Sequence, residues 1–190
     1  DDTKVYYTTD GSDPRMLGGT PNPNAISQTG GLQEEVLIEE GSIWKHNATN
    51  GNLGTEWRLL NYDDSEWQSG PAPLGYGGIS SGGVTIKIET EVNSARPRQP
   101  TSYFRKAFEI DDPAAYLSLS ANLLVDGGIV IFVNGIEAFR GSNLPTQTDY
   151  STVPTSDTDD GNEADYRAYP IDPNLLVSGS NIIVIELHNS

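Results

Sequence analysis

The chain of 190 residues contains no cysteine, which excludes disulfide scaffolds, zinc sites with cysteine ligands and thiol nucleophiles. Long apolar runs are missing as well, and hydrophobic residues make up only 35% of the chain. The longest uninterrupted run covers residues 129–133, far short of the roughly 20 residues that a membrane-spanning helix needs. The sequence therefore predicts no membrane span.

Basic residues are scarce: 11 Lys and Arg stand against 27 Asp and Glu, which gives a formal net charge of −16 at pH 7. Nucleic acids are bound mainly through Lys and Arg, so a chain this acidic repels them and anionic membranes over most of its surface. The first residues also lack the basic and apolar stretch of a secretory leader. We therefore expect either a cytosolic protein or one piece of a longer exported chain.

Helical patterns are nearly absent, whereas short apolar or alternating runs bounded by Gly, Asn, Asp and Pro recur along the chain. Single helical turns are expected at residues 113–117 and 173–176. Many short strands with almost no helix favour an all-β fold, an antiparallel β-sandwich of the jelly-roll type. The predicted strands lie near residues 4–9, 35–39, 84–90, 102–110, 116–124, 128–134, 136–140, 164–171 and 181–188.

The sharpest local prediction is a hairpin between residues 128–134 and 136–140. Asn134-Gly135 separates the two apolar runs, and both residue types tolerate the positive φ values that a type I′ turn requires. The predicted organisation has two parts. Residues 1–34 hold too few strands to bury a core alone, so they either pack on the larger body or end a preceding module. Residues 35–190 are predicted to form the sandwich.

Three stretches of the chain, which together cover most of it, resemble two known families. Residues 5–15 (VYYTTDGSDPR) resemble a strand and turn of the chitobiase/β-hexosaminidase C-terminal type of domain, of which residues 1–34 would be a part. The rest is similar to galactose-binding-like jelly-roll modules of secreted, multi-modular bacterial proteins. That similarity rests on residues 41–45 (GSIWK), Trp57, 62–67 (YDDSEW), 72–77 (APLGYG), 103–108 (YFRKAF), 126–128 (DGG), 134–135 (NG) and 181–188 (NIIVIELH).

The second resemblance has consequences for both fold and function. It implies a sandwich of about eight or nine strands and a non-catalytic accessory role, commonly sugar binding. It also implies an extracellular or cell-surface location, with neighbouring domains in a longer chain. Polysaccharide or another glycan is then the expected partner.

Residues 78–82 (GISSG) match the G-x-S-x-G pattern of a hydrolase nucleophile, and Asp126 and His188 follow in chain order. That motif needs a strand entering and a helix leaving, so that the serine projects from a strained turn. Glycines flank the segment and no helix can follow, so we interpret Ser80 as part of a glycine loop. The two histidines, His46 and His188, are expected at structural or rim positions, and we predict that the chain is not an enzyme.

Asp63-Asp64 and Asp111-Asp112 are carboxylate pairs, but adjacent strand residues point to opposite faces, so neither pair supplies the facing carboxylates of a glycosidase. We expect turns, the first of them seating a buried Trp67. The densest acidic cluster lies within residues 157–165 (DTDDGNEAD). Ca²⁺ accepts oxygen ligands from irregular loops, so a structural calcium ion and a solvated acidic loop both remain open. The candidate ligands are Asp157, Asp159, Asp160 and Glu163.

Sugars are bound by aromatic faces that stack on the ring and by polar neighbours that pair with hydroxyl groups. The aromatic residues in apolar or alternating contexts are expected in the core: Trp44, Trp67, Phe104, Phe108 and Phe132. Ligand binding is instead predicted for aromatics near loops or strand ends and for polar neighbours. These candidates are Trp57, Tyr76, Tyr103, Asp126, Arg140 and Tyr150.

One basic patch stands out, formed by Arg96, Arg98, Arg105 and Lys106. It could bind an acidic or sulfated glycan through bidentate hydrogen bonds, or pair with the protein's own carboxylates, which outnumber it. We therefore expect a neutral or mildly acidic polysaccharide, held weakly by stacking in a manner that salt barely changes. A structural or adhesive spacer without a glycan of its own is the alternative function.

Overall fold

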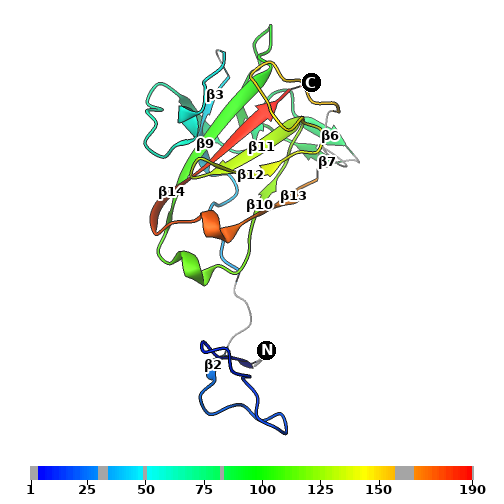
Figure 1. The fold of residues 1–190 in the computed structure, drawn as a ribbon. Coiled ribbons are helices and arrows are strands. Elements are labelled where there is room, and N and C mark those ends of the chain that lie inside the picture. Colours follow the sequence, from blue (N-terminus) through cyan, green and yellow to red (C-terminus); the bar gives the residue numbers. More distant parts are fainter. Residues whose placement is uncertain (1–3, 30–33, 49–50, 82–83, 157–164, 190) are drawn as a thin grey trace. The chain divides into compact units, whose positions relative to one another are not determined.

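The computed structural model describes residues 4–29, 34–48, 51–81, 84–156 and 165–189 (Figure 1). It divides the chain into two compact units, Asp1–Val36 and Leu37–Ser190. In the first unit, β1 (Lys4–Tyr7) pairs antiparallel with β2 (Ile26–Thr29). The segment between them turns at Asp10, whose carboxylate accepts a hydrogen bond from the Ser12 backbone at 2.9 Å.

The second unit is built around a six-stranded antiparallel sheet with the order β12-β11-β14-β9-β3-β4. The two longest strands pair along their whole length, from Gly179 opposite Ile110 to His188 opposite Thr101. The last residue of β14 and the first residue of β9 therefore lie side by side at one end of the main sheet. The strands of this sheet are β3 (Ile43–Asn47), β4 (Gln68–Pro71), β9 (Thr101–Ile110), β11 (Gly128–Val133), β12 (Ile136–Arg140) and β14 (Gly179–His188).

Smaller strand pairs complete the second unit. β10 (Leu119–Leu123) pairs antiparallel with β13 (Arg167–Ile171). The remaining pairs are parallel β5–β8 and antiparallel β6–β7, formed by β5 (Leu74–Gly75), β6 (Ile79–Ser81), β7 (Val84–Ile86) and β8 (Thr90–Glu91). The predicted all-β, antiparallel sandwich class is confirmed.

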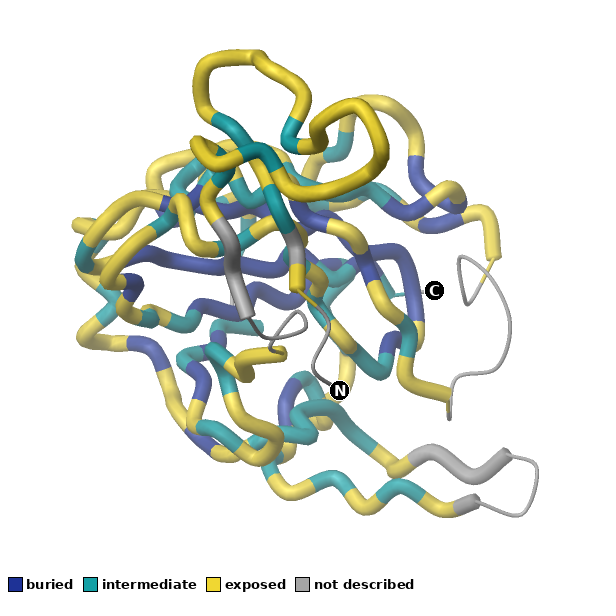
Figure 2. Tube along the Cα trace, turned by 90° about the horizontal axis from the view of Figure 1, so that it is seen from below, coloured by how far each residue is buried: buried dark blue, intermediate teal, exposed yellow. Residues whose placement is uncertain are grey.

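Both faces of the main sheet carry a buried cluster. Successive side chains of a strand point to opposite faces, so alternate residues of β11 belong to different clusters. Ile129, Ile131 and Val133 of β11 belong to one core cluster, which also contains Tyr169 and Ile171 of β13. The other cluster lies on the opposite face and includes Trp57, Trp67, Tyr103, Val130, Phe132, Leu144, Ile182 and Val184. In Figure 2, long runs of the trace are buried, and exposed residues gather in its outer turns. The loops are therefore carried by a rigid double core.

The predicted type I′ hairpin is confirmed: Asn134 and Gly135 have φ values of 52° and 85° between β11 and β12. The Asn134 carboxamide also donates to the Leu175 carbonyl at 2.8 Å and accepts from the Ile182 backbone at 3.0 Å. This side chain thus ties the hairpin turn to β14 as well as shaping the turn itself.

Two predicted helical turns are present as 3-10 turns, η2 (Pro113–Ala115) and η3 (Pro173–Leu175), each capped by the aspartate before it. The strand predicted at 35–39 is wrong, since its described residues form no strand and Leu37 and Ile38 pack on the core from a loop. Strands β2, β3, β4, β5 and β6 and the turn η1 (Glu56–Arg58) were not predicted. Polar residues, Gly and Pro dominate several of these segments, and such residues have low strand propensity.

Candidate functional site

The serine motif does not have the geometry of a nucleophile elbow. Ser80 lies within β6, which pairs antiparallel with β7 and is not followed by a helix. His188 is fully buried, with its Nδ1 3.0 Å from the Thr152 carbonyl oxygen and 3.1 Å from Thr101 Oγ1. Because a carbonyl oxygen only accepts, Nδ1 carries the proton and is committed to this contact. The imidazole is therefore a structural group inside the unit.

Two predicted ligand residues are corrected by their burial. Trp57 is 0% exposed and Tyr103 is 3% exposed, and their rings contact each other in the second core cluster at a centroid distance of 4.8 Å. Burial, followed by the nearby Glu186 carboxylate, raises the pKa of Tyr103 to about 12. Neither ring has a face open to a sugar. Of the aromatic residues predicted for the core, Trp44, Trp67, Phe104 and Phe132 are buried, and Phe108 is partly buried against the core.

Asp126 is exposed and Arg140 is half-buried, and neither lines the pocket described below. The Arg140 guanidinium is held by Glu137, with Nε 2.9 Å from Oε1, and by the Pro145 carbonyl at 3.2 Å. Asp126 precedes Gly127, which has a φ of 125° and approaches the His188 carbonyl so closely that a Cβ would lie 2.4 Å from that oxygen. Arg140 is thus occupied within the protein, and the 126–128 turn has a structural requirement for glycine.

The basic patch predicted from sequence is split by the fold. Arg105 is 2% exposed, and its Nε donates to Asp64 Oδ2 at 2.8 Å while Nη1 donates to the carbonyls of Trp57 and Leu59. Lys106 Nζ donates to the Ile43 carbonyl at 3.0 Å. These two cations serve the protein itself, which leaves Arg96 and Arg98.

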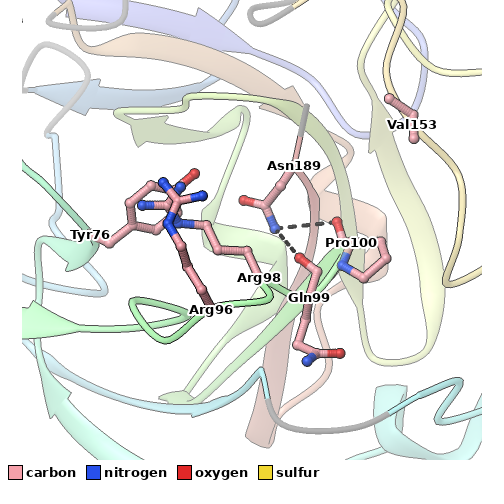
Figure 3. A pocket seen from close by; sticks show the side chains of 7 residues that line it. All are labelled: Tyr76, Arg96, Arg98, Gln99, Pro100, Val153 and Asn189. Carbon is pink, nitrogen blue, oxygen red and sulfur yellow. Dashed lines mark hydrogen bonds between the residues drawn. The ribbon is translucent and has the colours of Figure 1, made fainter.

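Arg96 and Arg98 meet Tyr76 in a pocket of about 320 Å³, which we call the Tyr76 pocket. Tyr76 follows β5, while the two arginines lie in the loop between β8 and β9. In Figure 3 both arginine side chains extend toward Tyr76. The Arg98 guanidinium carbon lies 3.8 Å from the ring centroid, a cation–π contact that covers one face of the ring. The pocket is lined by Tyr76, Arg96, Arg98, Gln99, Pro100, Val153 and Asn189.

Three side chains hold the loop that carries these arginines. The Asn93 carboxamide donates to the Gln99 carbonyl at 2.9 Å and accepts from the Gln99 backbone N–H at 2.7 Å, which closes residues 93–99 into a loop. Asn189 donates to the carbonyls of Gln99 and Pro100 at 3.1 and 3.2 Å (Figure 3). The Tyr150 hydroxyl donates to the Gln99 side chain. Tyr150 therefore acts beside the pocket, as a brace.

The charge balance of the Tyr76 pocket differs from that of the rest of the molecule. Within the described part of the chain, neither Arg96 nor Arg98 has a carboxylate within ion-pair distance, and Arg98 Nε is buried without a hydrogen-bond partner. Two guanidinium groups that have no carboxylate partner among the described residues and lie beside an aromatic ring favour an anionic or strongly hydrogen-bonding ligand.

Sequence reasoning identified Tyr76 as a loop aromatic but missed Asn93, Gln99 and Asn189. A signal for Asn93 was available, since Asn is among the few non-glycine residues that adopt a positive φ, here 58°. The predicted calcium ligands of the 157–165 loop lie outside the described residues, so calcium stays a prediction. Among the described residues, no group of three or more Asp, Glu or His side chains could hold a metal ion.

No helix in the described ranges combines the length and apolar character that crossing a membrane requires. No protein-family model matches the sequence, and no curated protein matches it.

Several solved structures resemble the chain. A β-glucuronidase from glycoside hydrolase family 2 matches with 13% identity and a TM-score of 0.46, over 82% of this chain and 15% of that chain. An uncultured Clostridium sp. β-glucuronidase matches with 15% identity and a TM-score of 0.47, over 80% and 22%. A β-glycosidase from Bacteroides vulgatus matches with 19% identity and a TM-score of 0.43, over 80% and 17%. The chain thus spans between 15% and 22% of the length of these glycosidases.

Proposed function

We propose that the second unit is a non-catalytic, carbohydrate-binding accessory domain of a secreted, multi-modular protein, and that the Tyr76 pocket is its glycan site. The observation that carries this proposal is a loop pocket on a β-sandwich, with an aromatic ring and with arginine donors that have no carboxylate partner among the described residues. Binding residues are commonly presented in this way, by loops that a β scaffold positions. The volume of about 320 Å³ lies at the lower end of the range for small-molecule sites, enough for one or two sugar rings.

The polar groups of the pocket suit a saccharide. Hydroxyl groups need donors and acceptors in fixed positions, and the Gln99 loop is fixed by hydrogen bonds from Asn93 and Asn189. A loop that is ordered before binding loses little conformational entropy when a ligand arrives. The Val153 side chain, 61% exposed, adds an apolar wall on which the C–H face of a sugar could rest.

Affinity electrophoresis against a panel of neutral and acidic polysaccharides tests this proposal. At least one polysaccharide should slow the wild-type protein, and Tyr76→Ala should weaken that binding by about fivefold or more, since a buried aromatic contact contributes about 1 kcal/mol. Tyr166→Ala is the matched control, because Tyr166 is 52% exposed and lies outside the pocket. This control should migrate like the wild type.

A panel that slows neither the wild type nor the variants would contradict the proposal. In that case a structural or adhesive spacer becomes the better description of the unit. Equal losses for Tyr76→Ala and Tyr166→Ala would also contradict it, because binding would then not reside in the Tyr76 pocket.

A further inference from the structure

We propose that the Tyr76 pocket recognises an oxyanion on its glycan, the carboxylate of a uronic acid or a sulfate ester, through Arg96 and Arg98. This inference rests on the proposed function and names the ligand class of the same site. It departs from the neutral or mildly acidic ligand, insensitive to salt, that the sequence alone predicts.

The first argument is the contrast with four of the five other arginines of the chain. Arg15, Arg58, Arg105 and Arg140 each lie within 3.4 Å of a carboxylate oxygen of the protein. In a chain with 27 acidic residues, such partners are abundant. Within the described residues, Arg96 and Arg98 are adjacent in the same pocket and have none.

The second argument is the cost of leaving the pocket empty. Two guanidinium groups that line one small cavity repel each other, and a buried N–H without a partner costs free energy through lost hydration. Arg98 Nε is such a group. An oxyanion relieves both penalties, since a carboxylate or sulfate accepts paired N–H groups from a guanidinium in a bidentate arrangement.

The third argument is that the Arg98 guanidinium and the loop that carries both arginines are positioned before a ligand arrives. The ring of Tyr76 holds the Arg98 guanidinium carbon at 3.8 Å from its centroid, and the Asn93 carboxamide closes the loop that carries both arginines. The net charge of −16 makes the site selective, because the protein repels polyanions except at this local positive pocket. Non-specific adsorption of an acidic polymer is therefore disfavoured.

The test uses three polymers with one backbone: dextran, carboxymethyl-dextran and dextran sulfate. Binding to the complete chain is measured by affinity electrophoresis and by calorimetry at several salt concentrations. We expect retention by at least one of the two anionic polymers and none by dextran, with affinity falling steeply as salt rises. The carboxymethyl and sulfate arms show which oxyanion the pocket accepts.

The decisive variant is the double substitution Arg96→Gln and Arg98→Gln, which should weaken binding at least about tenfold because charge-assisted hydrogen bonds are lost. Its charge-matched control is Arg15→Gln with Lys87→Gln, two exposed cations outside the pocket. The control has the same net charge and should bind like the wild type. Replacing both arginines by Lys keeps the charge but removes the planar fork, and should give an intermediate affinity. Circular dichroism melting curves confirm that each variant is folded.

Three outcomes overturn the inference. If the double variant retains anionic polymer as well as its charge-matched control does, the arginines are not the receptor. If a neutral polysaccharide is bound and Tyr76→Ala abolishes this binding while the double variant does not, the glycan site stands and its anion selectivity fails. If no polysaccharide of either kind is bound, the proposed function fails together with the inference.

Discussion

Two pockets of the second unit each contain an arginine beside a tyrosine ring, but they differ in whether a carboxylate of the protein pairs with that arginine. In the Tyr62 pocket, of about 330 Å³, the Arg105 guanidinium carbon lies 5.2 Å from the Tyr62 ring centroid. Arg105 Nε donates to Asp64 Oδ2 at 2.8 Å, so the protein supplies its own anion. In the Tyr76 pocket, Arg98 lies 3.8 Å from the ring centroid and no carboxylate of the described residues reaches it.

The difference separates a structural cation from a binding cation. Arg105 is 2% exposed, and its carboxylate and carbonyl partners lie within residues 57–64. We call these residues the covering segment, because Trp57 packs on one face of the main sheet. Removal of Arg105 would disturb the covering segment. Arg96 and Arg98 make no such contacts with the described residues, so we expect their charge to be available to a molecule from outside. The kind of residue is therefore a poorer guide to function than the partners that the fold provides.

The largest effect is expected from removing the arginine of the Tyr62 pocket. Arg105→Met leaves Asp64 and the Trp57 and Leu59 carbonyls without their donor, and removal of one member of a buried ion pair costs about 3–5 kcal/mol. The melting temperature should fall by roughly 10 °C. Circular dichroism during heating measures this change.

The matched control for that experiment is Arg96→Met in the Tyr76 pocket. Surface substitutions away from a buried network change stability by about 0.5 kcal/mol or less, so this variant should melt within about 2 °C of the wild type. Equal melting temperatures for the two variants would show that the two pockets do not differ in the way described.

A smaller effect is expected at the hairpin turn that borders the covering segment. Gly135 has a φ of 85°, and a Cβ there would lie 2.9 Å from Leu59 Cδ2. Gly135→Val adds backbone strain of roughly 1–2 kcal/mol and pushes on the residue whose carbonyl binds Arg105. The melting temperature should fall by several degrees. Gly135→Asn, which tolerates positive φ, should lose less, and an equal loss would point to the contact with Leu59 rather than to the turn.

The hairpin turn and strand β4 show what could and what could not be predicted from the sequence. The 134–135 turn and the central strands depend on local patterns, a turn dipeptide and apolar runs, and they were found. Strand β4 (Gln68–Pro71) carries no apolar pattern and is a strand only because β3 pairs with it. Its existence depends on a neighbour and not on its own residues.

The candidate site was only partly predictable for a similar reason. Tyr76 and Trp57 both belong to loop or turn segments, and only the fold distinguishes them, because Trp57 is enclosed by Trp67, Tyr103 and Phe132. The pairing of Arg105 with Asp64 joins residues 41 positions apart in the chain. No local pattern indicates that Arg105 pairs with a carboxylate and that Arg98 has none among the described residues.

The smallest effect concerns pH. His46, on the same strand as Lys45 of the Tyr62 pocket, is 4% exposed, and burial lowers its pKa below the usual 6.5. The unfolded chain therefore takes up a proton more readily than the folded chain. The contribution of His46 to the free energy of unfolding is fully present above about pH 6.5 and is lost as the solution becomes more acidic. Urea unfolding between pH 7 and 5 should show this loss in the wild type and less of it in His46→Gln. A parallel pH profile for the variant would exclude His46 as the cause.

The central position of β14 sets the order in which this unit can fold. β14 supplies the partner of both β9 and β11, yet it comprises residues 179–188. Until β14 is available to pair, β11 with β12 and β9 with β3 and β4 form two separate groups of strands with unpaired edges. Domains generally fold as whole units, so the main sheet is complete only when β14 joins both groups.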